Sequence, residues 1–525
     1  MDRTQKWAIT LFSIGVFMAA LDNGIITSAL TTIIYSFKVT TNWGAWAITI
    51  YTLGLAISVP IIGKLSDKYG RKRLFLIEII LFGLGSFLVA ISPNFTWFLI
   101  SRVIQSLGGG GIFIIASSYV LNVFPKEKQG RVLGMLGGMN GIAAILGPNI
   151  GSFILDVTGN WHWLFFINLP IGLFLFIFGF IFIAEGRESN THPLDWRGIS
   201  FLTLAILSFM YGLTNLDGVN IFESIIEPSF YGFVGAGLLL LAFLFFMEQG
   251  LARKGGDPIL PVELLKLPTY RWTLFIGFLS GAFLASVIFI PGYVEQFLGV
   301  DASKSGYWFT PLALASGIGA GGGGALVDKK GPIFTLIIAS VICFIGFMLF
   351  PLWVDTTWQM VVASCFVGLG FGMMLGAPVN VLATEGTEEN KGVSLGTLSL
   401  VRQIGMTLFP TIYAGFLARS FTSVGGDIQR NLQQAGVNPD MMPAGEMARF
   451  AEMKDFQSLM NLIEQIPVPL IRETIETTIH NAVGRGFNQL FICSAVLAVL
   501  SLLGVIVLGV IRKRKISGEA KAQME

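Results

Sequence analysis

Long stretches without a charged side chain constrain this chain more than any other feature of its sequence. Seven of them contain no Asp, Glu, Lys or Arg: 39–63, 132–155, 157–184, 272–294, 331–354, 356–384 and 486–511. A helix of about 20 apolar residues crosses the hydrocarbon core of a bilayer, and each stretch is long enough to supply one. Only 13% of the 525 residues are charged and 53% are hydrophobic. The sequence therefore excludes a water-soluble globular fold and predicts an all-α membrane protein.

Similar segments between these stretches bring the number of expected transmembrane helices to fourteen. Their approximate bounds are 8–34, 45–63, 74–92, 97–122, 132–156, 161–184, 198–216, 230–250, 272–297, 305–327, 333–353, 357–383, 392–418 and 486–511. The first segment is not a cleavable signal peptide, because it is long, lacks a small-residue cleavage site and is followed at once by another span.

The basic residues predict the orientation of the chain. Lys and Arg cluster after the second, fourth, tenth and last spans, whereas the loops 92–97 and 156–161 contain none. Because Lys and Arg gather on the cytoplasmic side of membrane proteins, both termini are expected in the cytoplasm and the protein in the cell membrane. The even number of spans agrees with this orientation.

Several classes of chemistry are not expected. The three cysteines lie inside spans, where they pack as free thiols, and the three histidines are isolated and give no metal-site spacing. No Walker loop precedes a helix, so ATP hydrolysis is not expected. There is also no credible Ser-His or Cys-His constellation. We expect no enzymatic activity, no metal and no nucleic-acid partner.

The chain contains an internal repeat. The loop "GKLSDKYGRKR" at 63–73 shares the pattern Gly-x-x-x-Asp-x-x-Gly with "GALVDKKGP" at 324–332, 261 residues later. At an offset of 262, "KEKQGRVLG" at 126–134 matches "EENKGVSLG" at 388–396, and Pro148 matches Pro410. Duplicated halves are common in transporters, which bind substrate between them. We predict three parts: an N-terminal six-helix bundle (1–185), a linker with two extra spans (186–271) and a C-terminal six-helix bundle (272–525).

Two segments have no counterpart in this repeat. The extra spans near 198–216 and 230–250 read as an inserted hairpin that bridges the bundles and packs against them. Residues 420–485 form a long polar segment between the last two spans, and apolar residues at helical spacing predict a short amphipathic helix at 451–466. This segment is interpreted as a structured surface loop. It could also cap the outer opening, guide a lipid or dock a partner.

The repeated loop is the most specific signal in the sequence. Gly63 permits close helix approach, Gly70 shapes a tight turn, and Asp67 can accept hydrogen bonds from helix N-termini or from Arg side chains. Such contacts could form a latch that is made in one conformation and broken in another, and Asp328 stands at the equivalent place in the second copy. The alternative is a basic loop that only sets topology.

Two arginines lie within spans, where a cation is costly and usually faces a cavity or a partner. Arg102 lies a few residues into the fourth span, and the second half has Ser364 at the equivalent place, which favours a functional role. Arg402 lies about ten residues into the thirteenth span and needs an anionic partner or water. Snorkelling of Arg102 to the interface is the alternative.

The fifth span carries glycines at steps of three and four residues: Gly134, Gly137, Gly138, Gly141, Gly147 and Gly151. They form a smooth face for another helix, and Pro148 permits a kink. This face could act as a hinge or sliding surface, or as a static helix contact.

Asp22 is the only charged residue between Trp7 and Phe37. An ionised carboxylate in hydrocarbon is expensive, so this acid would hold a proton when dry and lose it when wet. We hypothesise that Asp22 couples transport to protons. The alternatives are a structural hydrogen bond or a fixed ion pair, with Arg402 as a possible partner. Glu78 and Glu295 lie nearer span ends and are weaker candidates for proton binding.

These motifs resemble the major facilitator superfamily, and in particular its fourteen-helix drug–proton antiporter branch, the QacA-like and EmrB-like exporters. The resemblance covers nearly the whole chain. "GKLSDKYGRKR" resembles the superfamily's loop between helices 2 and 3, "RVIQSLGGGG" its basic motif in helix 4, and "GIAAILGPNIG" the antiporter motif of helix 5. Further similarities to this branch are "WHWLFFINLPIG" (161–172), "LDWRG" (194–198) and "YVEQFLG" (293–299).

The resemblance implies roles for individual residues. Asp67 and Arg71 would belong to the gate, Arg102 would take part in proton coupling, and Gly147 with Pro148 would belong to the antiporter signature. Asp22 stands where relatives carry Leu-Asp-x-Thr-Ile-Val-Asn. Here Gly24 replaces the Thr and Thr27 replaces the Asn.

From the residues and the resemblance we expect a monomeric exporter of amphipathic or cationic drugs, driven by the proton gradient without a cofactor and contributing to antibiotic resistance. Its partners would be a small amphipathic substrate, protons and membrane lipids. Asp22, Arg402 and Glu295 would line the substrate cavity. A lipid or glycolipid exporter of the same fold and a non-transporting membrane sensor or scaffold are the rival interpretations.

Overall fold

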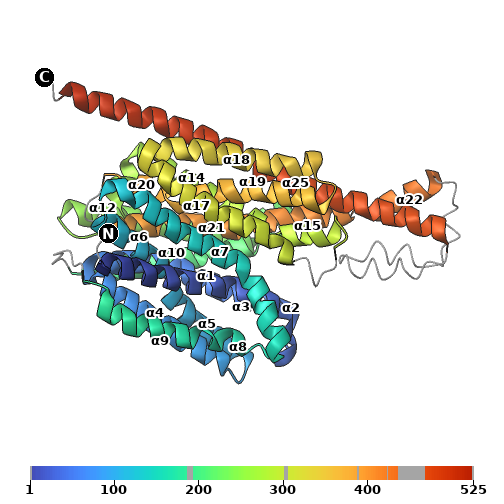
Figure 1. Ribbon diagram of the computed structural model, residues 1–525, viewed down its shortest axis with the longest axis horizontal. Coiled ribbons are helices and arrows are strands. Elements are labelled where there is room, and N and C mark those ends of the chain that lie inside the picture. The colour runs from blue at the N-terminus through green and yellow to red at the C-terminus, as the bar shows by residue number, and fades with distance from the viewer. Residues whose placement is uncertain are drawn as a thin grey trace.

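The computed structural model describes residues 3–185, 193–300, 306–386, 390–422, 424–434 and 468–522. Throughout these ranges the regular structure is helical (Figure 1). The expected all-α fold is confirmed. The amphipathic helix expected at 451–466 lies outside the described residues.

The first half consists of nine helices. They are α1 (Arg3–Phe37), α2 (Thr41–Gly44), α3 (Trp46–Tyr69), α4 (Arg71–Ala90), α5 (Phe95–Gly109), α6 (Ile112–Val123), α7 (Lys126–Thr158), α8 (Trp163–Phe166) and α9 (Asn168–Phe182). Local chemistry sets their ends. Asn94 caps α5 by accepting a hydrogen bond from the Trp97 amide at 2.9 Å, and Gly159 ends α7 in a left-handed conformation.

The second half contains the remaining helices of the two bundles. They are α14 (Pro268–Val287), α15 (Ile290–Gln296), the 3₁₀ helix η1 (Gly306–Phe309), α17 (Thr310–Lys330), α18 (Pro332–Trp353), α19 (Thr357–Gly376), α20 (Pro378–Thr384), α21 (Lys391–Thr422), α22 (Val424–Gln434) and α25 (Pro469–Ala522). The halves meet where α7 packs on α17 and α19, and where α3 and α6 pack on α21.

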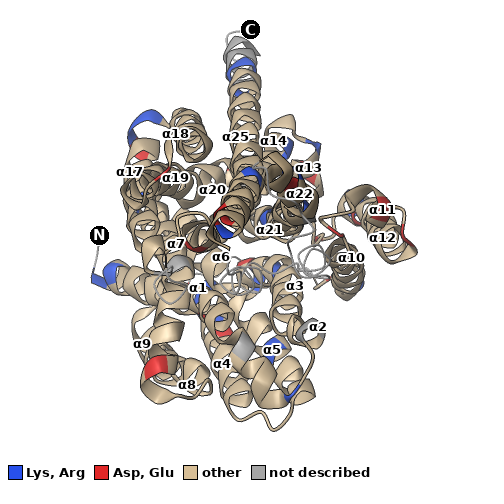
Figure 2. Ribbon diagram, turned by 90° about the vertical axis from the view of Figure 1, so that its right-hand side faces the viewer, with Lys and Arg blue, Asp and Glu red and all other residues tan. Residues whose placement is uncertain are grey.

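The inserted segment comprises α10 (Trp196–Thr214), α11 (Ile221–Ile225), α12 (Pro228–Arg253) and α13 (Val262–Lys266). In the end-on view of Figure 2, α10 and α12 lie beside the two bundles rather than within either of them. α10 contacts both α3 and α21, so the insertion rests on the seam between the halves. An ion pair between Lys64 of α3 and Asp257, in the loop after α12, attaches it to the repeated loop.

The number of spans agrees only in part with the sequence. Twelve helices in the described ranges are long and apolar enough to cross a membrane, and counting the bent α7 gives thirteen. The expected span 392–418 lies in α21, which has 32 residues but is not among them. Three cations, Lys391, Arg402 and Arg419, together with several hydroxyl side chains, dilute its apolar sequence.

The bend in α7 measures 44° and lies between Ala144 and Leu146. Pro148 has no amide hydrogen to donate to the Ala144 carbonyl, which explains a bend at this point. The kink that the sequence permits is therefore present. α1 crosses α7 beside it, since a Cβ added at Gly24 would lie 2.8 Å from the Ala144 carbonyl oxygen and from the Gly147 Cα.

Candidate functional site

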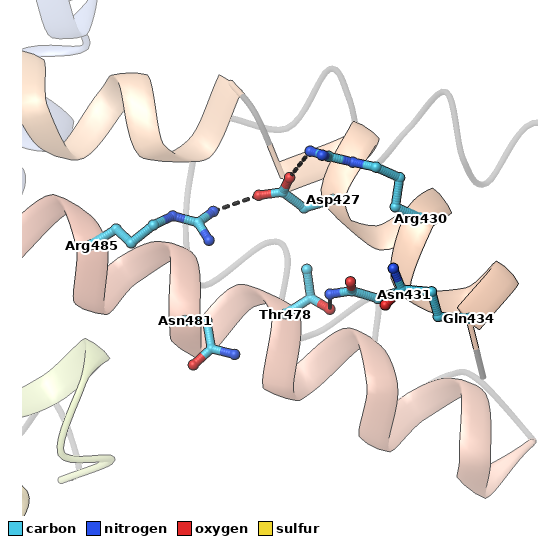
Figure 3. Close-up of a pocket in the computed structure, with 7 residues that line it drawn as sticks. All are labelled: Asp427, Arg430, Asn431, Gln434, Thr478, Asn481 and Arg485. Atoms are coloured by element: carbon cyan, nitrogen blue, oxygen red, sulfur yellow. Dashed lines mark hydrogen bonds and ion pairs between the residues drawn. The ribbon is translucent and has the colours of Figure 1, made fainter.

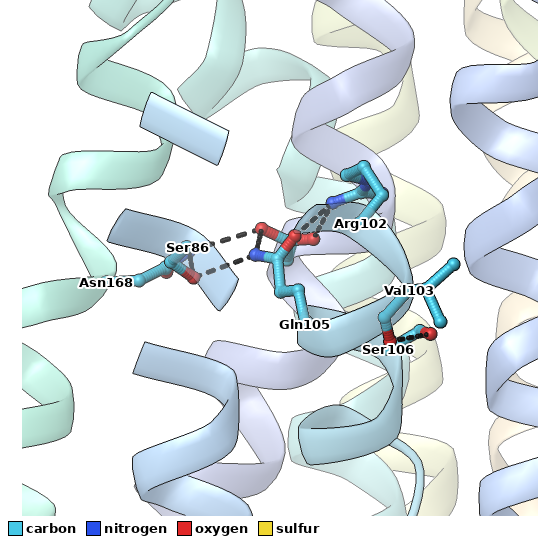
Figure 4. A network of polar contacts seen from close by, with 7 residues as sticks. Ser86, Arg102, Val103, Gln105, Ser106 and Asn168 are labelled. Carbon is cyan, nitrogen blue, oxygen red and sulfur yellow. Dashed lines mark hydrogen bonds and ion pairs between the residues drawn. The ribbon is translucent and has the colours of Figure 1, made fainter. Parts of the chain in front are cut away.

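Asp22 lies in the middle of α1 and is 1% exposed. Its Oδ2 accepts a hydrogen bond from Arg102 Nη1 at 2.7 Å, and its Oδ1 accepts from Gln105 Nε2 at 2.8 Å and from Asn168 Nδ2 at 3.1 Å. Ser86 Oγ closes the network by accepting from Gln105 at 2.8 Å and Asn168 at 3.2 Å (Figure 4). The carboxylate is thus satisfied by donors from two other helices.

Helix geometry explains how these side chains converge. Arg102 and Gln105 are three residues apart and therefore share one face of α5. The Arg102 Nη1 atom also donates to Gln105 Oε1 at 2.6 Å. Ser86 lies on α4, and Asn168 is the first residue of α9. The network therefore ties α1, α4, α5 and α9 together at one depth.

Arg102 is fully buried, and its guanidinium carbon lies 3.9 Å from the centre of the Tyr51 ring. Such cation–π contacts stabilise a buried cation. Among the described residues, however, its Nε and Nη2 atoms have no hydrogen-bond partner. Leaving donors of a buried cation unpaired is costly. The guanidinium is therefore held mainly by Asp22, Gln105 and the Tyr51 ring.

The structure corrects one pairing considered from the sequence. Asp22 forms its ion pair with Arg102 and makes no hydrogen bond or ion pair with Arg402 or Glu295. Arg402 belongs to α21, which packs on α14, and its Nε donates to Ser280 Oγ of that helix at 3.1 Å. Glu295 is half-buried on α15. These three residues do not form one ionic cluster.

The first copy of the repeated loop joins the two halves. Arg71 donates to Asp67 Oδ1 at 3.2 Å and to Ser118 Oγ at 3.0 Å, within the first half. Asp67 Oδ2 accepts from the Val393 amide at 3.2 Å, in the first turn of α21. Amides in the first turn of a helix lack intrahelical acceptors, which makes this position suited to a carboxylate.

The second copy makes the same contact in the opposite direction. Asp328 accepts from the amides of Gly130 at 2.7 Å and Arg131 at 2.9 Å, in the second turn of α7. Arg131 and Val393 are separated by the repeat offset of 262, so the carboxylate of each half bonds to the equivalent helix of the other. The two halves are therefore bonded together on the face that carries the basic loops.

The glycines of these loops have equivalent tasks. A Cβ at Gly63 would clash with the Gly392 carbonyl, and one at Gly324 would clash with the Gly130 carbonyl. Gly70 and its counterpart Gly331 both adopt positive φ, 96° and 86°. The antiporter-motif glycines are divided between partners: Gly147 and Gly151 face α1, whereas Gly141 faces Ser316 of α17.

Sequence reasoning missed several members of the site. Gln105, Ser86, Asn168 and Tyr51 were assigned no role, although Gln105 is one helical turn from Arg102. Asn168 lies in the quoted "WHWLFFINLPIG" segment. Gly24, noted only as a replacement, proves to be the contact point for Gly147.

The described part of the segment 420–485 forms a separate polar cleft of about 170 Å³ between α22 and α25 (Figure 3). Asp427 pairs with both Arg430 and Arg485, and Asn431 Nδ2 donates to Thr478 Oγ1 at 2.8 Å. In Figure 1 the helix α22 lies at the end of the molecule opposite to both termini.

Residues 12–410 match the family described as Major Facilitator Superfamily. The chain belongs to this family. It is therefore a multi-pass membrane transporter and not an enzyme, as expected. The "Uncharacterized MFS-type transporter YfiU" of Bacillus subtilis (strain 168) is 56% identical over 504 residues, which cover 96% of this chain and 97% of the relative.

Two further comparisons place this major facilitator protein among its relatives. "Multidrug resistance protein 3" of Bacillus subtilis (strain 168) is 31% identical over 428 residues, covering 80% of this chain and 81% of the relative. The crystal structure of the human organic anion transporter MFSD10 (TETRAN) aligns with a TM-score of 0.62 at 13% identity, covering 96% of this chain and 100% of that chain. This likeness supports the major facilitator fold.

Proposed function

We propose that this transporter exports amphipathic or cationic compounds across the cell membrane in exchange for protons, with Asp22 and Arg102 as the coupling pair. The observation that carries the proposal is the ion pair between them, 2.7 Å long and buried inside the first bundle. The similarity to multidrug transporters supports a drug-like cargo. The energy comes from the proton gradient, and an inward elementary charge gains roughly 2.3 kcal/mol per 100 mV.

Burial links the protonation of Asp22 to conformation. Protonating the carboxylate in the observed state would leave Arg102 buried without a counter-ion. Breaking a buried pair in this way costs about 3–5 kcal/mol. The protonated form therefore belongs to a different conformation, in which water reaches the guanidinium. This order is the reverse of the one expected from the sequence, in which a dry Asp22 holds the proton, because the buried Arg102 supplies a counter-ion. Proton binding and alternating access become one equilibrium for this reason.

The contacts between the halves on the side that carries the basic loops, called the basic face, give the second part of the proposed transport cycle. With the basic loops and both termini in the cytoplasm, the bonds of Asp67 and Asp328 across the halves correspond to a state closed toward the cytoplasm. Their release opens the cytoplasmic side for substrate loading. Membrane lipids surround a monomer that works without a cofactor.

Proteoliposomes with an imposed pH gradient test the proposal, with ethidium as the labelled cation. The wild type is expected to accumulate ethidium only when the gradient is present, whereas Asp22→Asn loses gradient-driven accumulation. Asp156→Asn, an exposed carboxylate on α7, serves as the matched control and keeps it. Gradient-driven accumulation by Asp22→Asn would refute the coupling role. Movement of a labelled glycolipid without any movement of ethidium would favour the lipid exporter instead.

A further inference from the structure

The fourth membrane span is interrupted between α5 and α6. Residues Gly110 and Gly111 separate the two helices. The Gly110 amide still donates to the Ser106 carbonyl at 3.1 Å. The next bond of an uninterrupted helix would join the Gly111 amide to the Leu107 carbonyl, but both groups are bonded to side chains instead.

Two side chains replace this missing backbone bond. Ser58 Oγ, from α3, donates to the Leu107 carbonyl at 2.9 Å. Glu78 Oε2, from α4, accepts from the Gly111 amide at 2.8 Å. A carboxyl and a hydroxyl are thus inserted into the helix that carries Arg102, one on each side of the break. Insertion of side chains into the hydrogen-bond ladder is a recognised cause of helix bending.

Glu78 is fully buried, and in the described ranges its Oε1 has no hydrogen-bond partner. An ionised carboxylate in such a place would have one amide donor and no cation, which is far less favourable than the neutral acid. The geometry is also tight, since a Cβ at Gly111 would lie 2.8 Å from Glu78 Oε2. The neutral acid is therefore the form that fits this conformation.

Tyr51 is the titratable neighbour at the same break. A Cβ added at Gly109 would lie 3.1 Å from its hydroxyl, and its ring carries Arg102 on one side. Helices α3, α5, α6, α8 and α9 pack against α4. Apart from exposed Arg73, the other charged or titratable side chains on α4 and on these helices have partners other than Glu78. The ion pairs are Lys64 with Asp257, Asp67 with Arg71, and Arg102 with Asp22. The ring contacts are Lys68 with Tyr69, Lys72 with Phe180, and Tyr119 with Phe12.

We propose that Glu78 is a second proton-binding carboxyl of this transporter, and that its protonated form holds the fourth span open between Leu107 and Gly111. The inference rests on the proposed exchange of substrate for protons. If the break closes, the Gly111 amide returns to the Leu107 carbonyl and Glu78 loses its hydrogen bond. When water enters the gap, the proton passes from the carboxyl to water and the carboxylate stays behind.

This step connects two acids in one bundle. Closing the break shifts α5 relative to α6, and α5 carries both Arg102 and Gln105, which hold Asp22. Ser86 of the same network lies about two turns beyond Glu78 on α4. The protonation of Glu78 therefore acts on the position of Arg102 through the helix that bears it, without direct contact with Asp22.

Proton counting with purified protein tests the proposal. Ethidium is added in a weakly buffered detergent solution, and the protons released per protein are measured. Glu78→Gln keeps an acceptor for the Gly111 amide but cannot titrate, so it is expected to release one proton fewer than the wild type. Glu248→Gln is the matched control. Glu248 is also fully buried and accepts an amide bond from Ile259, but it lies in the inserted hairpin.

Equal proton release from Glu78→Gln and the wild type would overturn the inference and assign Glu78 a structural role. If Asp22→Asn abolishes the proton release and Glu78→Gln does not change it, the inference about Glu78 fails while the proposed function stands. If ethidium releases no proton from the wild type, the proposed function fails for this cation, and infrared spectroscopy alone decides the role of Glu78.

Infrared spectroscopy also covers the case in which Glu78→Gln does not fold. At neutral pH the wild type and Glu248→Gln are both expected to show a protonated-carboxyl band that shifts when glutamate, but not aspartate, is labelled with ¹³C. The absence of such a band from folded Glu248→Gln protein would overturn the proposal. Its disappearance when Glu78→Gln is added to Glu248→Gln, in folded double-variant protein, would support it, because the equally buried Glu248 can no longer contribute a band of its own.

Discussion

At the scale of single residues, Asp22 depends on neutral donors as well as on Arg102. Asn168 donates to both Asp22 and Ser86 from inside the bundle. Replacing it with Ala should lower the free energy of unfolding by about 1–3 kcal/mol, because a buried charged acceptor loses a donor. Thermal unfolding in detergent measures the effect. Asn23→Ala, at the exposed position next to Asp22, should unfold like the wild type. An unchanged midpoint for Asn168→Ala would contradict the importance of the network.

The sequence singled out Asp22 and Arg102 separately but did not pair them. Apolar spans have no polar stripe that fixes how one helix is rotated against another. From the sequence, Asp22 could therefore face Arg402 as readily as Arg102, which lies 80 residues away from it. The sequence ranked Glu78 as a weaker candidate for proton binding for a related reason. Its distance from a span end was readable, but the break at Gly110 and Gly111 is a property of the folded helix.

At the scale of helices, the crossing of α1 and α7 depends on two glycines. A Cβ at Gly147 would lie 2.8 Å from the Gly24 carbonyl carbon, so Gly147→Ala must push the helices apart. We expect a loss of about 1–3 kcal/mol in stability together with slower transport. Gly83→Ala on α4 has nothing within 4 Å of its added Cβ and provides the control. Denaturation measures the change in stability, and an ethidium transport assay measures the change in rate. Equal stability and equal transport in Gly147→Ala and Gly83→Ala would contradict the close crossing of α1 and α7.

Spacing alone predicted this small-residue face and the kink at Pro148. It did not predict that the face is shared, with Gly147 against α1 and Gly141 against α17. A stripe of small residues shows that close approach is possible. Which helix approaches is decided by the packing of the whole bundle, and here both its own half and the opposite half take part.

At the scale of the whole molecule, Asp67 and Asp328 should contribute to one conformational equilibrium. Asp67→Asn or Asp328→Asn weakens charge-assisted bonds of about 1.5–3 kcal/mol each. Either substitution should therefore shift the population toward an open basic face by about tenfold or more. Spin labels at Lys128→Cys and Lys330→Cys, in a background without the native cysteines, report the separation of the halves. The control Asp156→Asn should leave the distribution of spin-label distances unchanged. An unchanged distribution in Asp67→Asn and Asp328→Asn would contradict the role of the latch.

The internal repeat is enough to identify the duplicated loops from the sequence. The reciprocal bonding between the halves followed from neither copy alone, because each carboxylate reaches a helix of the opposite half. The number of spans was harder to predict. Cations and hydroxyl groups in α21 reduce its hydropathy, although its position in the fold corresponds to a span.

The coupling role of Asp22 is tested most directly by proton release from the purified transporter. Ethidium is added to wild type, Asp22→Asn and Asp156→Asn in weakly buffered solution. The wild type and Asp156→Asn should release protons in proportion to bound ethidium, whereas Asp22→Asn should bind ethidium and release fewer. Proton release from folded Asp22→Asn that equals the wild type would contradict the coupling of this carboxylate to transport.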